Sequence, residues 1–161
     1  MKKTLFLSSI LLFAGCSVVQ KTTKHIQNFS KCYIHKIPAP FWVCYQSSFL
    51  GVGKVSAEKL SRIKREEAYS EGISSLIATL QSKTSLLLRK IDIDKKTSAK
   101  ILADIKKFVI INANEGKYWY DKKSKILYVQ AFIDENEFKS FLQKELNINK
   151  IKFEKLYNET F

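Results

Sequence analysis

Two cysteines and two histidines near the start of the chain are the side chains best suited to chemistry. His25, Cys32, His35 and Cys44 supply two thiols and two imidazoles, which is numerically a zinc-ligand set. Structural zinc usually pairs close ligands in two knuckles, but only Cys32 and His35 are close in this sequence. The spacing therefore argues against zinc, and we expect no metal site.

The sequence does not place a nucleophile and a histidine base together in the expected folded region. Both histidines precede the expected folded region, so a serine or cysteine nucleophile would have to find its base outside the fold. Gly51 and Gly53 are reminiscent of a nucleotide loop. A phosphate loop, however, needs a glycine and a hydroxyl residue where Ser48 and Val55 stand. We predict no catalytic residues and no cofactor, and we interpret the glycines as sites of close approach by a helix or another chain, or as a bulge.

The first residues of the chain predict export. Lys2 and Lys3 precede an apolar run from Leu5 to Phe13, which is roughly half the length needed to cross a bilayer. Small residues follow at the place where a signal peptidase needs a narrow substrate. We therefore expect residues 1–15 to be a signal peptide and not a membrane span.

The end of this segment, Phe13-Ala14-Gly15-Cys16, resembles a bacterial lipobox. In such a motif the thiol is diacylglycerylated, the chain is cut between Gly15 and Cys16, and the new amino group is acylated with a fatty acid such as palmitate. Two or three acyl chains give a stable membrane anchor. We expect lipidation of Cys16, the alternative being an ordinary signal peptide. Ser17, in place of an inner-membrane retention aspartate, favours the outer membrane by resemblance to enterobacterial sorting.

Export also bears on the remaining two cysteines. In an oxidising compartment Cys32 and Cys44 can form a disulfide that closes a short loop around Pro38 and Pro40. The alternative is two unpaired thiols, with Cys44 acting as a small buried hydrophobe.

Composition predicts one folded domain on a tether. The chain has 161 residues, of which 45% are hydrophobic and 27% charged, values that exclude a disordered chain. Residues 16–39 are polar and lack periodicity, as expected of a lipid-anchored tether. Residues 40–161 are expected to form the domain, ending in a helical tail.

The chain is strongly basic, with a formal net charge of +13. This charge suits contact with lipopolysaccharide, peptidoglycan or phospholipid head groups, all of which are anionic. The alternative is that lysine is simply the common polar surface residue of an A+T-rich genome. Because the lysines are spread along the chain and form no dense block, we do not expect nucleic-acid binding.

Hydrophobic periodicity predicts the first half of the domain as a strand and two helices. A strand is expected over Phe49–Val55, followed by a long helix from Ser56, its cap, to about Arg89. Ala68 and Gly72 on that helix would allow close packing near the glycine strand. A shorter helix is expected from Thr97 or Ser98 to Lys107, with Asp94 or Thr97 near its cap.

The second half predicts a hairpin and a closing helix. Residues 108–113 are expected to be a strand that resumes, after a bulge or turn, at Tyr118–Tyr120. A turn over Asp121–Lys125 leads into the alternating strand Ile126–Ile133, and Asp134 or Asn136 caps the last helix. The expected fold is α+β, with a small antiparallel sheet of about three strands packed by a long helix and shorter helices in the order β-α-α-β-β-α.

A sheet with helices on one face leaves the other face open. We predict that aromatic side chains occupy this open face and, together with the intervening Trp119, form an interaction surface. Its members are Tyr118, Trp119, Tyr120, Tyr128 and Phe132. The alternative is that the tail after Asn147 folds back and covers them.

Several of these segments, taken in order, are similar to the LPP20 family of bacterial outer-membrane lipoproteins over nearly the whole mature chain. They are the lipobox, the tether, Pro40-x-Trp42-Val43, Phe49-Leu50-Gly51-Val52-Gly53, the helix from Ala68 to Leu80, Trp119-Tyr120-Asp121, Leu127-Tyr128-Val129 and the closing helix. This sequence departs from the family where Phe41 fills a slot that is often Asp and where Cys44 follows the Trp-Val pair.

The resemblance implies an SHS2-like domain without catalytic residues. The family includes surface lipoproteins and flagellar lipoproteins that polymerise into a disk around the motor. We therefore expect a non-enzymatic outer-membrane lipoprotein that acts by self-association or by binding envelope or flagellar proteins, through a strand edge, the aromatic face and the tail from Ile148 to Phe161. The alternatives are a basic lipoprotein that binds peptidoglycan or lipopolysaccharide, and a surface adhesin.

Overall fold

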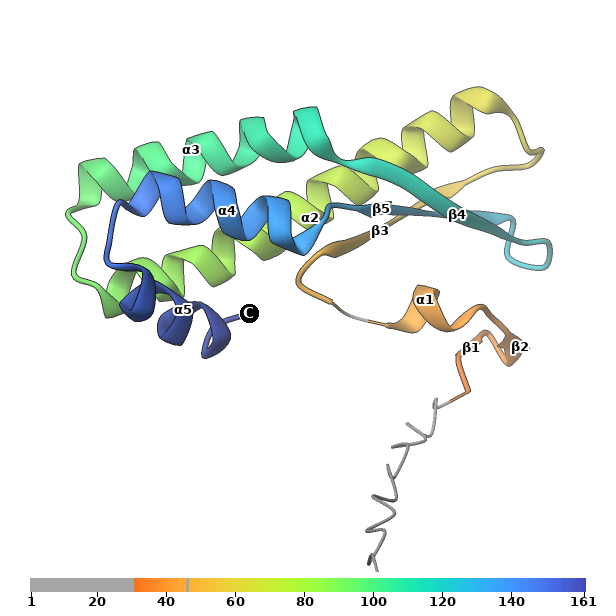
Figure 1. Cartoon of the computed structure of the whole chain (residues 1–161). Coiled ribbons are helices and arrows are strands. Elements are labelled where there is room, and N and C mark those ends of the chain that lie inside the picture. Colours follow the sequence, from red (N-terminus) through yellow and green to blue (C-terminus); the bar gives the residue numbers. More distant parts are fainter. Residues whose placement is uncertain (1–30, 46) are drawn as a thin grey trace, which may run out of the picture.

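The structure, a computed structural model, describes residues 31–45 and 47–161 and is α+β (Figure 1). A three-stranded antiparallel sheet lies at one end of the molecule, and helices extend from it to the other end. The elements are β1 (Tyr33–Ile34), β2 (Ile37–Pro38), α1 (Phe41–Cys44), β3 (Leu50–Ser56), α2 (Arg62–Lys90), α3 (Lys95–Asn112), β4 (Asn114–Asp121), β5 (Ile126–Phe132), α4 (Glu135–Leu146) and α5 (Lys150–Asn158). The predicted small sheet packed by helices is confirmed.

The sheet has the order β3-β5-β4, so that β5 is central and both other strands are edges. Its register pairs Gly53 with Val129 and Tyr118 with Val129 across the two ladders. Paired residues of an antiparallel ladder share a face. Gly53, Val129 and Tyr118 therefore lie on the face that α2 covers, and their neighbours in sequence lie on the opposite face.

Helix α2 approaches this sheet closely because two glycines remove the side chains between them. A Cβ at Gly53 would lie 1.8 Å from the carbonyl oxygen of Ala68, and one at Gly51 would lie 2.1 Å from that of Gly72. The prediction that the glycines admit the following helix is confirmed. Ala68 and Gly72 are buried at this contact, as expected for small residues that let the helix pack closely on the strand.

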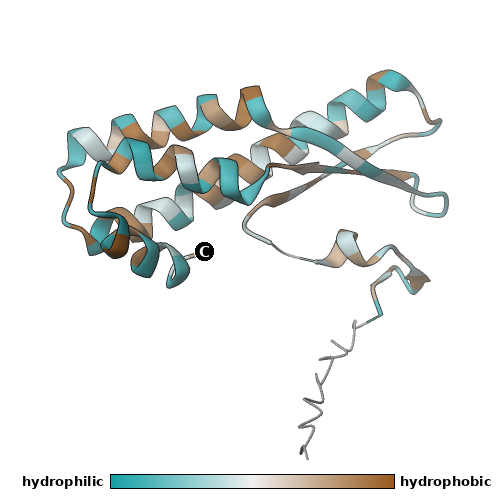
Figure 2. Ribbon diagram, viewed as in Figure 1, coloured by the Kyte–Doolittle hydropathy of each residue, from teal (hydrophilic) through white to brown (hydrophobic). Residues whose placement is uncertain are grey.

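The main core lies beyond the sheet, among the four longer helices. The second half of α2 contributes leucines, α3 contributes Ile101, Ile105 and Val109 at helical spacing, and α4 contributes Phe138 and Leu142. Hydrophobic and hydrophilic residues alternate along these helices in Figure 2. This core holds the helical end of the molecule together.

Helix α2 begins five residues later than the sequence pattern suggested. Ser56 is the last residue of β3 and pairs with Ile126, so it does not cap the helix. The cap is Ser61, whose hydroxyl accepts a hydrogen bond from the backbone N–H of Lys64. The strand extends because β5 offers it backbone partners through Ile126.

Residues 108–112 are helical and belong to α3, so the prediction of a strand there was wrong. Their β-branched character favoured a strand, but Val109 continues the buried stripe of Ile101 and Ile105. Phe108 stacks on Phe141 of α4 with ring centres 4.4 Å apart. Packing on α4 therefore overrides local β propensity, and β4 begins only at Asn114.

The later predictions held more closely. The β4–β5 turn spans Lys122–Lys125, a bulge interrupts β4 between Glu115 and Tyr118, and Asp134 caps α4 by accepting hydrogen bonds from two backbone N–H groups. The tail does not cover the open sheet face. It forms α5, which buries Phe153 and Tyr157 in the helical core.

A small N-terminal unit of β1, β2 and α1 lies on the side of the sheet away from α2 (Figure 1). Its strands pair Tyr33 with Pro38 and Ile34 with Ile37. Defined structure therefore begins before Pro40, inside the segment that the sequence assigned to the tether. The lysine-rich turn between β4 and β5 lies at the same end of the molecule as this unit.

Candidate protein-binding surface

Gly15 and Cys16, the predicted cleavage and lipidation positions, lie outside the described residues, as does His25. Among residues 31–45 and 47–161, the structure contains no helix that is long and apolar enough to cross a membrane. In the same residues no three His, Cys, Asp or Glu side chains group as metal ligands would.

Cys32 and Cys44 are joined by a disulfide, with their Cα atoms 5.8 Å apart. Of the two alternatives for these thiols, the structure therefore has the covalent pair. The bond ties the start of β1 to the end of α1 and closes the N-terminal unit around its two prolines. Both sulfur atoms are consumed by this bond, which gives them a structural role.

The aromatic residues predicted as one surface are divided between the two faces of the sheet. Tyr118 and Tyr120 lie on the α2 face, whereas Trp119, Tyr128 and Phe132 lie on the opposite face. The prediction of a single five-residue surface was wrong because Tyr118–Trp119–Tyr120 is one extended strand, in which successive side chains alternate.

The two faces use their aromatic side chains differently. Tyr120 is structural, since its hydroxyl donates to the carbonyl oxygen of Ala57 over 2.8 Å. On the opposite face the rings of Trp119 and Tyr128 lie 5.3 Å apart, and Tyr128 is buried. Burial, with a smaller contribution from the charge of Asp121, raises the pKa of the Tyr128 phenol. Of the three aromatic residues on this face, Trp119, Tyr128 and Phe132, only Phe132 is exposed.

Tyr118 remains half exposed beside a shallow apolar groove. The groove has a volume of about 350 Å³ and runs between the start of α2 and β4. Leu60 and Ile63, which are exposed at 52% and 74%, lie at the same end of α2. The guanidinium of Arg65 sits 4.6 Å above the Tyr118 ring and also pairs with Glu115. The sequence analysis did not single out Leu60 or Ile63, which fall within the helix it expected from Ser56 to about Arg89.

The two sheet edges differ in how they are protected. On β3 the backbone N–H of Lys54 donates to the carboxylate of Glu71 on α2, and Leu50 forms a bridge with Ser47. On β4 no described residue outside β5 is paired with the strand by a ladder. A bulge and a lysine at Lys117 are the devices that limit unspecific pairing there. The segment Tyr118–Tyr120 is regular, and no strand pairs with its outer edge among the described residues.

A polar cluster joins the N-terminal unit to the β4–β5 turn. The Nδ1 atom of His35 lies 3.6 Å from Oδ2 of Asp121, and the hydroxyl of Ser124 donates to the same oxygen. Asp121 is almost fully buried, and the Ser124 hydroxyl, aided by the backbone N–H groups of Lys123 and Ser124, holds its pKa below the usual range. Because His35 and Ser124 both contact Asp121, the cluster holds the β1–β2 turn against the β4–β5 turn. Sequence reasoning, which left His35 in a tether, missed it.

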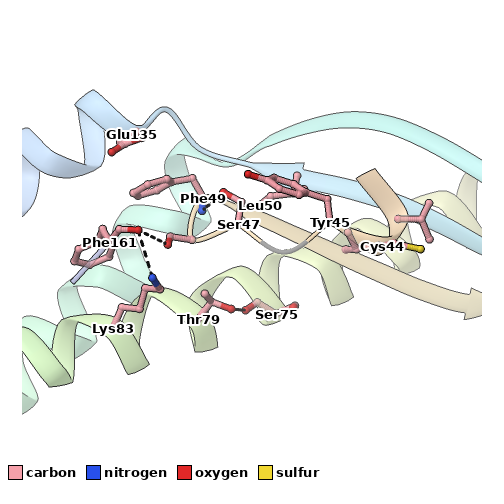
Figure 3. Close-up of a pocket in the computed structure, with 13 residues that line it drawn as sticks. Cys44, Tyr45, Ser47, Phe49, Leu50, Ser75, Thr79, Lys83, Glu135 and Phe161 are labelled. Carbon is pink, nitrogen blue, oxygen red and sulfur yellow. Dashed lines mark hydrogen bonds between the residues drawn. The ribbon is translucent and has the colours of Figure 1, made fainter. Parts of the chain in front are cut away.

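A cavity of about 830 Å³ lies on the β3 side between the N-terminal unit and Phe161 (Figure 3). Its polar groups are largely bonded to one another. Lys83 donates to the backbone oxygens of Thr160 and Phe161, and Ser48 donates to that of Phe161. These hydrogen bonds tie the C-terminal residues to α2 and leave few free polar groups for a ligand in the cavity.

No protein-family model matches this chain, and no curated protein shows significant similarity to it.

Proposed function

We propose that this chain is a non-enzymatic lipoprotein, anchored by fatty acyl chains on Cys16, that works in the outer membrane by pairing with a second copy of itself through β4. The observation that carries the proposal is the edge segment Tyr118–Tyr120, which has no ladder partner beyond β5 among the described residues, next to the groove lined by Leu60, Arg65 and Tyr118. An added strand gains main-chain hydrogen bonds at such an edge and side-chain specificity from an adjacent groove. The resemblance to the LPP20 family, including its disk-forming members, agrees with this proposal.

Self-pairing is favoured because the edge is complementary to itself. The edge offers the same backbone N–H and C=O groups to both copies, so a two-fold axis through Tyr118–Tyr120 can pair the segment with itself. The exposed Tyr118 ring then reaches the groove beside the partner's edge. The bulge limits how many residues pair, which suits a specific contact better than unlimited growth.

The β4 contact is tested by the mass of the purified full chain in detergent, measured by light scattering. Tyr118→Glu places a charge at the centre of the contact and is expected to weaken self-association by about tenfold or more. Tyr33→Glu is the matched control, since the two rings are exposed at 50% and 51%. A monomeric wild-type chain, or equal effects of both substitutions, would show that β4 is not the contact.

The anchor is tested separately by cell fractionation. Cys16→Ser is expected to release the protein from the membrane fraction and to abolish incorporation of a labelled palmitate analogue, because the thioether and the processed amino group both depend on that cysteine. Label that persists in this variant would contradict lipidation at Cys16. This result is independent of the mass measurement.

A further inference from the structure

Two turns that are distant in sequence meet at one end of the molecule. The β1–β2 turn consists of His35 and Lys36, and the β4–β5 turn spans Lys122–Lys125. The contact between His35 and Asp121 brings these turns together (Figure 1). The disulfide supports the contact from the other side, since it ties the ends of the N-terminal unit to each other.

This juxtaposition gathers positive charge. Lys36, Lys122 and Lys123 are exposed, and within the described ranges none of them pairs with a carboxylate. Lys125, by contrast, pairs with Glu58, and Asp121 is buried under Ser124 and His35. We call Lys36, Lys122 and Lys123 the turn lysines. They form a cationic surface on two turns that the contact between His35 and Asp121 holds together.

The backbone of the first turn is unusual in a way that favours a functional role. His35 and Lys36 have φ values of 48° and 66°, which is the left-handed region that two-residue hairpin loops reserve for asparagine and glycine. Two L side chains in such a loop cost stability, and strain of this kind gathers at functional sites. Here the strained residues are the ones that contact Asp121 and extend the cationic surface.

The turn lysines also stand at the end of the domain from which the chain leads back to Cys16. Lys31 follows Cys16 by 15 residues, a length that spans at most about 50 Å. The turn end can therefore meet the surface that holds the anchor. The start of α3, with its own exposed lysines, lies at the far end of the molecule (Figure 1).

We propose that the turn lysines bind the phosphate groups of anionic phospholipids in the membrane that carries the anchor. Each lysine held near such a surface adds to binding, and the three lie on turns that the His35–Asp121 contact holds together. The inference rests on the proposed anchoring for its geometry, but its test does not use the anchor.

The test measures binding of the full chain carrying Cys16→Ser to vesicles of phosphatidylcholine, with or without one-third phosphatidylglycerol. The triple change of Lys36, Lys122 and Lys123 to Gln is expected to weaken binding to the anionic vesicles by about 100-fold. Binding to pure phosphatidylcholine should not change. Added salt should remove the advantage of the unsubstituted lysines, because it screens exposed charges.

The matched control changes Lys95, Lys96 and Lys100 to Gln, which removes the same charge from the start of α3. This control should retain most of the binding. Equal losses in both triple variants would reduce the effect to net charge and overturn the inference, as would unchanged binding of the turn-lysine variant. Loss of binding to purified peptidoglycan without loss on vesicles would also contradict it. Self-association through Tyr118 is measured by mass, so these failures leave that proposal standing.

Discussion

Gly53 lies directly under the backbone of Ala68, so close that a Cβ on the glycine would sit 1.8 Å from the Ala68 carbonyl oxygen and 2.4 Å from the nitrogen of Gly72. Backbone atoms inside a long helix cannot move aside cheaply. The contact places α2 against β3 and thereby orients the start of the helix, where Leu60 and Arg65 line the groove at β4. The proposed binding edge therefore depends on a missing side chain on the opposite edge strand.

Gly53→Ala is expected to destabilise the protein by about 3 kcal/mol or more, since the added methyl must push the helix from the sheet. Gly116→Ala is the control. Its Cβ would meet the end of the Gln130 side chain, which can rotate away, and the cost should stay below about 1 kcal/mol. Urea denaturation of both variants measures the difference. Similar midpoints for the two would mean that the α2–β3 contact is looser than described.

The glycine pair also shows what the sequence could predict. Two glycines in an apolar strand, followed by a helix with alanine and glycine on its buried stripe, are sufficient to predict close packing of one on the other. The alternating strand 126–132 and the Asp134 cap were equally predictable, because each depends on neighbours in sequence. These local signals agree with the packing, so the predictions made from them held.

Other features depend on contacts that no local pattern contains. Residues 108–112 look like a strand until Phe108 is placed against Phe141 on another helix. The contact between His35 and Asp121 joins positions that are 86 residues apart in the chain. Tyr118 and Trp119 were grouped by their chemistry, whereas strand geometry sends them to opposite faces. The sequence could therefore predict an aromatic surface on the sheet, but not which of the aromatic residues share one face.

The disulfide is expected to stabilise the N-terminal unit selectively. A bond between cysteines 12 residues apart restricts the unfolded chain by about 3 kcal/mol in the loop-entropy model. With Cys16→Ser as background, the full chain should show no reactive thiol until reductant is added. Reduction should then speed tryptic cleavage after Lys36, which lies between the two cysteines, while the far-ultraviolet circular dichroism of the helices changes little. Reactive thiols in the unreduced chain would contradict the bond.

The tail helix should behave as part of the core. Phe153→Ala removes a ring that is fully buried among the helices and should cost about 3 to 5 kcal/mol. Ile151 lies two positions away and is 81% exposed, so Ile151→Ala should stay within about 0.5 kcal/mol of the parent. Urea denaturation compares them. Deleting residues 148–161 would accordingly disturb folding before it could report on self-association. Equal stability of the two variants would show that α5 is not docked.

Acid should loosen the clamp between the turns. The Ser124 hydroxyl and two backbone N–H groups bond the charged form of Asp121, so its pKa in the folded protein lies below the ordinary value of 3.8. A carboxyl group with a lowered pKa contributes stability that is complete above its ordinary pKa. That contribution is lost as the pH falls through the lower, folded value.

Asp121→Asn is therefore expected to lower the thermal midpoint at pH 7 and to lower it less as the pH falls below 3.8, because the parent then loses the same charge. Asp92→Asn is the control, since Asp92 is exposed and asparagine also tolerates its left-handed φ of 55°. Calorimetry between pH 7 and pH 3 measures the difference in thermal midpoint between the parent and each of the two variants. A difference between parent and Asp121→Asn that stays constant over this range would mean that the charge of Asp121 does not hold the turns. The turn lysines would then need another support for their shared surface.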